Sequence, residues 1–331
     1  MKKYLLGGIG QFYKAQLHLH TNISDGLLTP QEVKEAYKAQ GYSIVAFTDH
    51  EVIVPHNDLT DKDFLAITAY EQSVNERYDG SNFQFMKAYH FNFYAKDKNK
   101  TWSPCFSEKC LWLNHFRDYV SKEQWEVNYP IAYTIEQVND MLEKAKEHGF
   151  LVTYNHPAWS QQSYLDYIHL KGLWGVETYN YDSAMNGLVD TETAFEDLLK
   201  AGNNIVPVSV DDMHNIGTAF GGFTMIEVES LDYDTVLNAM EKKQLYASMS
   251  PIIEELYIEN DMLTVHCSKA THIILNTDRR WCRTKRGECL TEAVFDISEW
   301  RRWNKYLEDG KKAFIRLTIV DEFGKDRKSV V

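Results

Sequence analysis

The stretch His18-Leu19-His20-Thr21-Asn22-Ile23-Ser24-Asp25-Gly26, followed later by Phe47-Thr48-Asp49-His50, decides the fold. Residues two apart in a strand project from the same face, so His18 and His20 can reach one point. The turn that follows adds the carboxylate of Asp25. Imidazole and carboxylate groups are the ligands that borderline divalent metals prefer. The stretch therefore predicts a metal site at the end of a strand.

The residues between the two motifs predict one strand–turn–helix–strand unit. A helix is expected from Pro30, which suits a first helical turn, to Gln40, just before a glycine in the usual position after a helix. The apolar strand 43–47 then delivers His50 at its carboxyl end. The polar groups of the unit gather at one end.

Strand and helix patterns alternate in about seven such units, up to about residue 247. The expected strands are 64–69, 83–94, 150–154, 173–178, 205–210, 224–228 and 245–247, and the expected helices are 134–148, 161–170, 191–200 and 232–243. The alternation predicts an α/β fold with a parallel sheet, and the number fits a closed barrel. Function in such barrels lies at the carboxyl ends of the strands. Further polar residues fall there: Glu71, His156, Glu177, Asp212 and His214.

The stretch 97–133 interrupts the alternation and is rich in tryptophan and tyrosine. We interpret it as an insertion, partly helical over 107–122, that packs over the main domain. Its aromatic side chains could stack on a planar ligand. A small satellite core is the interpretation that we favour.

From about residue 251 the pattern changes to short β segments separated by turn signals. These segments are 252–258, 263–267, 272–276, 293–297 and 314–320, and no long helix is evident. They predict a small all-β, sandwich-like domain. We therefore expect two domains, residues 1–250 and 251–331.

Composition narrows the possible functions. The formal net charge of −13 disfavours a surface that tracks long nucleic acid. No apolar run is long enough for a membrane span, and the amino terminus lacks a signal-peptide pattern. The odd number of cysteines, five, without Cys-x-x-Cys spacing, favours free thiols in a reducing compartment. We therefore expect a cytoplasmic protein with no membrane partner. The sequence does not indicate the oligomeric state.

Over about residues 13–250 the sequence resembles the polymerase and histidinol phosphatase (PHP) family, and in particular its stand-alone, CehA-like branch of metal-dependent hydrolases. The shared pieces, in order, are His18-x-His20 with Asp25-Gly26, Thr48-Asp49-His50, Glu71, His90, Asn155-His156-Pro157 and Asp212-x-His214. The resemblance implies a distorted (β/α)7 TIM-like barrel with two or three divalent ions, manganese, zinc or iron. A C-terminal β-sandwich also occurs in that branch.

Carried onto this sequence, the resemblance implies three metal positions. The first would be held by His18, His20, Glu71 and Asp212. Glu71 would bridge to a second ion, held also by His90 and His156. Asp25, His50 and His214 would hold the third, and the position of Asp25 is a histidine in some members. No ligand is missing, so we expect an active enzyme.

The expected function is that of a hydrolase, a phosphoesterase that cleaves a small phosphorylated molecule, a nucleotide among the candidates, through a metal-activated water. Arg77 is a candidate phosphate clamp, although a solvated loop arginine is the simpler interpretation. Asn155, Glu177 and Asn180 are candidates for binding substrate or orienting ligands, with structural caps as the alternative. The alternatives for the whole protein are a hydrolase of a non-phosphate ester or amide, a nuclease, and a non-enzymatic metal-binding interaction module.

Overall fold

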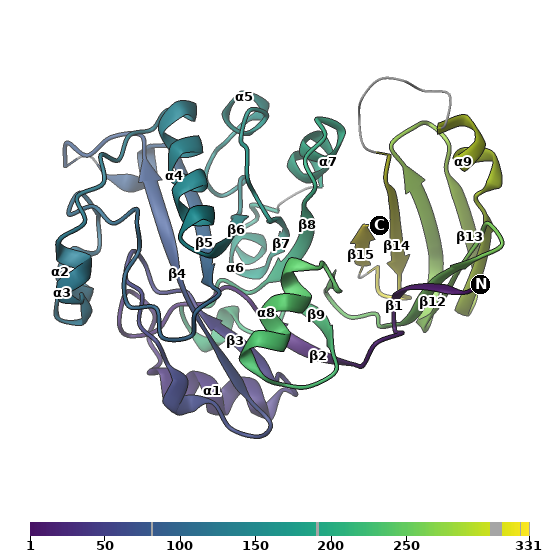
Figure 1. Ribbon diagram of the computed structural model, residues 1–331, viewed down its shortest axis with the longest axis horizontal. Helices are drawn as coiled ribbons and strands as arrows, with labels where there is room; N and C mark the ends of the chain where they lie inside the picture. Colours follow the sequence, from purple (N-terminus) through teal and green to yellow (C-terminus); the bar gives the residue numbers. More distant parts are fainter. Residues whose placement is uncertain (81, 190–191, 305–312, 325, 331) are drawn as a thin grey trace.

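The computed structural model describes residues 1–80, 82–189, 192–304, 313–324 and 326–330. Figure 1 shows two parts side by side, a barrel-like part with helices around it and an antiparallel sheet. Among the described residues no helix has both the length and the apolar character that a membrane span requires.

A nearly closed sheet forms the first part. Its strands lie in the order β2 (Gln11–Gln16), β3 (Ile44–Phe47), β4 (Leu65–Asn75), β5 (Ala88–Ala95), β6 (Phe150–Tyr154), β7 (Gly175–Asn180) and β8 (Val206–Val210). The chain beyond β2 meets the chain beyond β8, where Leu19 and Met213 form a parallel bridge. This pairing nearly closes the barrel, so the α/β class and the barrel-like sheet are confirmed.

Strand direction departs from the expected parallel sheet. Strands β2, β3 and β4 are mutually parallel, as are β6, β7 and β8, but β5 runs antiparallel to both of its neighbours. The connection from β4 to β5, in its described residues, contains the 3-10 turn η2 (Phe83–Phe85) and no α-helix. Without a crossover helix the chain returns as an antiparallel neighbour. The expectation of a parallel sheet with alternating strands and helices is therefore wrong at β5.

Helices on the outside of the barrel follow the local sequence signals. They are α1 (Pro30–Ala39), α4 (Ile135–Glu147), α5 (Tyr164–Tyr167), α6 (Tyr181–Met185), α7 (Thr193–Lys200) and α8 (Tyr233–Glu241). Thr29 begins α1 with a capping box to Glu32, and Thr134 and Asp232 cap α4 and α8 through their side chains. The buried side of α4 packs in one apolar cluster with β5 and β6.

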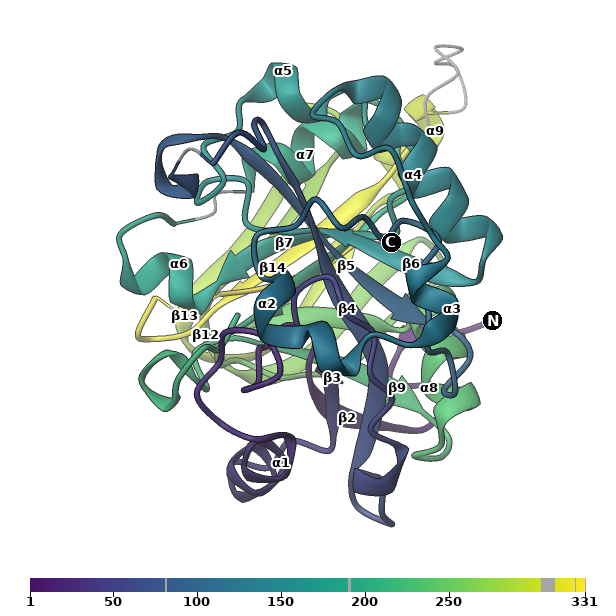
Figure 2. The same ribbon diagram turned by 90° about the vertical axis from the view of Figure 1, so that its left-hand side faces the viewer.

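The insertion forms a small core of its own, as we expected. It contains α2 (Leu113–Phe116), α3 (Lys122–Trp125) and the 3-10 turn η3 (Arg117–Tyr119). Phe106 and Phe116 are buried against Ile23 and Val52, which lie in the loops after β2 and β3. Figure 2 places α2 and α3 toward the viewer, in front of the barrel. The insertion is thus fixed to the same end of the barrel as the predicted ligands.

An antiparallel sheet forms the second part. It joins the barrel through β9 (Phe223–Val228) and β10 (Leu245–Ser248), which belong to the barrel edge. These two strands extend the barrel sheet beyond β2, and β10 pairs with β15 (Asp326–Val330). The other strands of this part are β1 (Lys3–Leu6), β11 (Ile253–Glu259), β12 (Met262–Thr277), β13 (Arg283–Asp296) and β14 (Ile315–Val320). All their pairings are antiparallel.

Three details of the second part differ from the expected segments. The segments 263–267 and 272–276 belong to one long strand, β12, which is irregular between them where its pairing with β13 shifts register. A short helix, α9 (Ser298–Asn304), follows β13. Strand β1, from the start of the chain, pairs with β11. The limits of the two domains stay a prediction.

A charged contact links the two parts. The side chain of Arg316 in β14 is 9% exposed, and its guanidinium pairs with Glu192 and, at 2.7 Å, with Glu196 of α7. Apolar packing is also continuous, because Tyr246 of the barrel edge and Ile253 of β11 belong to one buried cluster.

Candidate metal centre

The structure brings together all nine side chains that the sequence predicts as metal ligands. They lie at one end of the barrel and come from six places in the chain: His18, His20 and Asp25 after β2; His50 after β3; Glu71 in β4; His90 in β5; His156 after β6; and Asp212 and His214 after β8. All but Asp25 and His214 are buried. Residues far apart in sequence thus share one polar cluster inside an apolar fold.

The structure places the His18–His20 pair and Glu71 differently, relative to their strands, from what the sequence predicted. His18 and His20 follow β2 instead of lying in it, but the Leu19–Met213 bridge keeps this segment extended, with His20 N 2.9 Å from the carbonyl oxygen of Met213. Glu71 lies inside β4 instead of at the end of a strand. Because β4 pairs with β5 up to Asn75, its polar residues remain in the sheet.

Two histidines and two carboxylates converge at the first predicted position. The Nε2 atoms of His18 and His20 each lie 3.1 Å from Oδ1 of Asp212. They lie 3.3 and 3.5 Å from the carboxylate oxygens of Glu71. The four groups therefore point at one place with ring nitrogens and oxygens, as ligands of a divalent ion would.

Glu71 also faces the second predicted position. Its Oε1 lies 3.1 Å from Nδ1 of His90 and 3.2 Å from Nε2 of His156. The amide of Asn155 donates a hydrogen bond of 2.8 Å to the same oxygen. Glu71 is thus placed between two groups of histidines.

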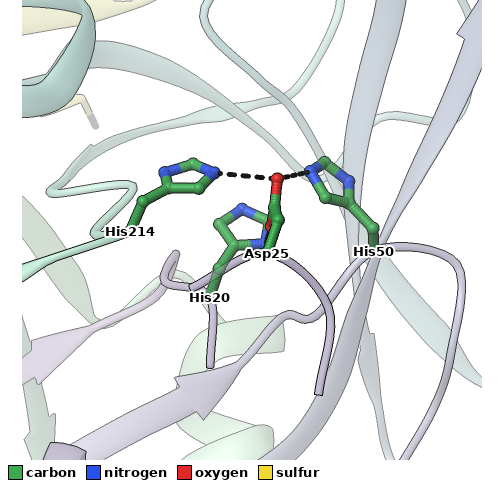
Figure 3. Close-up of side chains that lie close together, drawn as sticks. All are labelled: His20, Asp25, His50 and His214. Carbon is green, nitrogen blue, oxygen red and sulfur yellow. Dashed lines mark ion pairs between the residues drawn. The ribbon is translucent and has the colours of Figure 1, made fainter. Parts of the chain in front are cut away.

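The third predicted position is drawn in Figure 3. Oδ2 of Asp25 lies 3.4 Å from Nε2 of His50 and 3.5 Å from Nε2 of His214. The ring of His20 lies between them and stacks on His214 with centroids 4.3 Å apart. His20 therefore faces both the first and the third positions.

Protons on the histidines balance the carboxylate charges of the cluster. Burial lowers the pKa of His50, but the Asp25 and Glu71 carboxylates outweigh it and raise that pKa to about 10. In the same way, against burial, neighbouring carboxylates raise the pKa of His156 and of His214 to about 9. Neighbouring imidazoles in turn hold the carboxyl pKa values far below their usual range, despite burial: His50 and His214 for Asp25, His90 and His18 for Glu71, and His18 and His20 for Asp212.

The donor set fits divalent ions. Buried carboxylates need compensating positive charge, and metal ions can replace the protons that supply it here. The pKa of His20 is lowered by burial and by neighbouring His214 and His50, so this ring is already neutral and available as a ligand. The Nδ1 atom of His50 lies 3.2 Å from Oε2 of Glu71, so this ring faces that carboxylate as well as Asp25.

Glu177 and Asn180 lie behind the ligands and hold them. Glu177 Oε1 lies 2.7 Å from Nδ1 of His18, and its Oε2 accepts a hydrogen bond of 2.9 Å from the backbone N–H of His156. The Asn180 amide lies 3.0 Å from Glu177 and 3.1 Å from Asp212. Asn180 Oδ1 also caps α6. These contacts match an orienting role for both residues.

Arg77 lies apart from these residues. It is exposed, and its guanidinium donates a 3.3 Å hydrogen bond to the carbonyl oxygen of Phe85. It is not among the described residues that line the cavity beside the cluster. This geometry is that of a solvated loop arginine.

Sequence reasoning missed Asp49 as a support for the site, although it stands in the quoted motif. Its buried carboxylate accepts hydrogen bonds of 2.8 Å from the backbone N–H and the hydroxyl of Thr21 and from the hydroxyl of Ser24. It therefore fixes the turn that presents Asp25. The position of Asp49 directly before a candidate ligand was a signal that could have identified it.

A cavity of about 840 Å³ opens beside the cluster, and seven of the nine candidate ligands line it. Its other walls include Trp112 of the insertion and Trp159, which follows His156. Trp112 stacks on His50 at a centroid distance of 5.7 Å. The insertion thus forms both a satellite core and part of the cavity wall.

Comparison with known proteins gives one family match. The family model of the PHP domain matches residues 16–205, more than half of the chain. Among curated proteins none matches.

Solved structures with low sequence identity also match. A two-domain protein of Bacteroides vulgatus, described as containing a predicted PHP-like metal-dependent phosphoesterase, is 14% identical, with a TM-score of 0.47 over 99% of this chain and 97% of its own. An amidohydrolase of Chromobacterium violaceum is 15% identical, with a TM-score of 0.39 over 61% and 88%. A lesion-specific endonuclease of Pyrococcus furiosus is 17% identical, with a TM-score of 0.44 over 70% and 56%.

Proposed function

The chain belongs to the PHP domain family, and on this premise we propose that it is a metal-dependent phosphoesterase that hydrolyses a small phosphorylated molecule. The observation that carries the proposal is the convergence of nine imidazole and carboxylate groups on one cavity. The proposed ligand sets are those carried over from the family: His18, His20, Glu71 and Asp212; Glu71, His90 and His156; and Asp25, His50 and His214.

Two or three divalent ions, of manganese, zinc or iron, would supply the chemistry of the centre. Such ions lower the pKa of a bound water and offset negative charge on a phosphoryl group. Their charge also suits an acidic protein, because bound ions offset the carboxylates that the substrate phosphate meets at this site.

Side chains around the proposed ligands orient them through hydrogen bonds. Glu177 accepts a hydrogen bond from Nδ1–H of His18, so that Nε2 faces the cluster with its lone pair. The amide of Asn155 holds Glu71 between the two groups of histidines. Asp49 fixes the turn of Asp25. The polar network thus positions His18, Glu71 and the turn that carries Asp25.

The cavity favours a small substrate over a long polyanion. Among the described residues that line it, Lys87 is the only lysine or arginine, and its ammonium lies 2.8 Å from Asp166. A nucleic-acid track needs several cations along the phosphate backbone.

The cytoplasmic location stays a prediction.

Hydrolysis of a simple phosphate monoester tests the proposal. Purified protein loaded with Mn²⁺ should release phosphate from glycerol 2-phosphate or a related ester, and chelation should abolish turnover. Asp212→Asn should lose activity and bound metal together, whereas His169→Ala, at an exposed histidine, should keep both. Hydrolysis by the chelated protein at the same rate would contradict the proposal.

A further inference from the structure

Two tryptophans from different segments of the chain border the candidate metal centre. Trp112 comes from the insertion and stacks on His50 with an interplanar angle of 16°. Trp159 lies with its ring centroid 5.3 Å from that of His90 and 5.1 Å from that of His156. A phosphoryl group held by the cluster would therefore have its alcohol part beside these two indoles.

Further apolar side chains extend this wall toward solvent. Phe83 is 37% exposed, Phe85 78% and Leu111 41%, and all three line the cavity. Phe83 packs edge-on against Trp112 with centroids 6.0 Å apart. Apolar side chains that remain exposed around a cavity commonly mark a binding surface.

Charge in the rest of the cavity is negative. Outside the nine proposed ligands, the described lining residues contribute the carboxylates of Glu76 and Asp182. The cation of Lys87 already pairs with Asp166. A second anionic group on the substrate would therefore meet carboxylates and no unpaired cation among these residues.

We infer that this cavity selects phosphate esters whose alcohol part carries a planar ring without negative charge, and that Trp112 and Trp159 determine the selectivity. The inference rests on the proposed function. Indole rings give large apolar contact and favourable ring–ring geometry. The carboxylates of the wall disfavour anionic rings by repulsion across a partly dehydrated cavity.

Three alkyl phosphates with similar leaving groups test the selectivity. They are glycerol 2-phosphate, 2-phenylethyl phosphate and 2-(4-carboxyphenyl)ethyl phosphate. With the Mn²⁺-loaded full chain we expect the lowest KM for the phenyl ester, and a higher KM once the ring carries a carboxylate. Equal KM values for glycerol and phenyl esters would overturn the inference and leave the phosphoesterase proposal intact.

Variants of the two tryptophans test whether Trp112 and Trp159 cause the preference for the phenyl ester. Trp112→Leu and Trp159→Leu should each raise the KM for 2-phenylethyl phosphate about five- to tenfold, the range for one lost aromatic contact, with little change for glycerol 2-phosphate. The matched control, Trp303→Leu in α9, should leave both values unchanged. A loss that is equal for the two esters would mean that the tryptophans only support the histidines, and the assignment would fail.

A binding measurement separates this inference from the proposed function. If none of the three esters is hydrolysed, titration calorimetry with non-hydrolysable 2-phenylethylphosphonate on the Mn²⁺-loaded protein still reports on the cavity. Binding that weakens in Trp112→Leu and Trp159→Leu supports the inference even then. Absence of binding, or binding indifferent to both variants, overturns it.

Discussion

Oε1 of Glu177 lies 2.7 Å from Nδ1 of His18, and both side chains are fully buried. A carboxylate in this position fixes the histidine tautomer and turns Nε2 toward Asp212 and Glu71. Because a buried ring that could rotate would bind an ion less tightly, this contact connects the packing of the barrel to the proposed metal affinity.

Glu177→Gln should weaken metal binding while keeping the shape of the side chain. The amide is a poorer acceptor for the proton on Nδ1 of His18, so we expect affinity for Mn²⁺ to fall about 10- to 100-fold. Titration calorimetry on the metal-depleted protein measures this change. Glu241→Gln, at an exposed carboxylate of α8, is the control. Unchanged affinity in Glu177→Gln would show that the contact only packs the core.

Removal of metal should lower the thermal stability of the protein. Ions bind the native cluster and find no such cluster in the unfolded chain, so at a concentration about 100 times the Kd they add about 2.7 kcal/mol. Thermal melts with Mn²⁺ and with a chelator measure the difference. The shift should vanish in Asp212→Asn, and a shift of equal size in that variant would point to metal binding elsewhere.

The metal-free protein should lose stability as pH rises from about 6.5 to about 10. The pKa values of His50, His156 and His214 are raised to about 10, 9 and 9 in the folded state, compared with about 6.5 when unfolded. A raised pKa contributes stability that is complete below the unfolded value and is lost as pH passes through the folded value. Thermal melts in chelator across this range test the sign.

The same protons make metal binding pH-dependent. Each ion must displace protons from these rings, so affinity should increase from pH 6 to 9 and binding should release protons. Titration calorimetry in two buffers of different ionisation enthalpy counts the protons released. A count of zero at pH 7 would contradict the charge balance described here.

Arg316→Met should destabilise the fold through the contact between the two parts. The substitution keeps an apolar stem but leaves Glu192 and Glu196 without the guanidinium of β14. Both glutamates keep about a third of their side-chain exposure, so we expect a loss of about 1–2 kcal/mol, below that of a fully buried pair. Urea unfolding measures the loss. Lys62→Met, at an exposed lysine, is the control and should change stability little.

Local signals in the sequence predicted much of the barrel. Thr134, at the start of a period-3.6 pattern, marked α4, and the short apolar run 150–154 matched β6 at both bounds. The ligand residues were predictable because they stand in short motifs whose order follows the strands. Their convergence follows because the barrel brings these parts of its strands and loops together at one end.

Tertiary pairing decided the features that the sequence did not reveal. Glu71 lies inside β4 because β5 pairs along residues that look like a polar loop. Strand β12 runs through both predicted segments because β13 accompanies it along its length. The place of Trp112 in the cavity wall depends on how the insertion packs on the loops of Ile23 and Val52. Single-sequence patterns carry no information on such long-range contacts.

The central claim is that nine side chains at the end of the barrel hold divalent ions. Anomalous diffraction at the manganese edge, from crystals of the full chain grown with Mn²⁺, tests it most directly. We predict two or three anomalous peaks enclosed by His18, His20, Glu71, His90, His156, Asp212 and the Asp25, His50 and His214 group. The absence of any peak within this cluster at saturating Mn²⁺ would contradict the account.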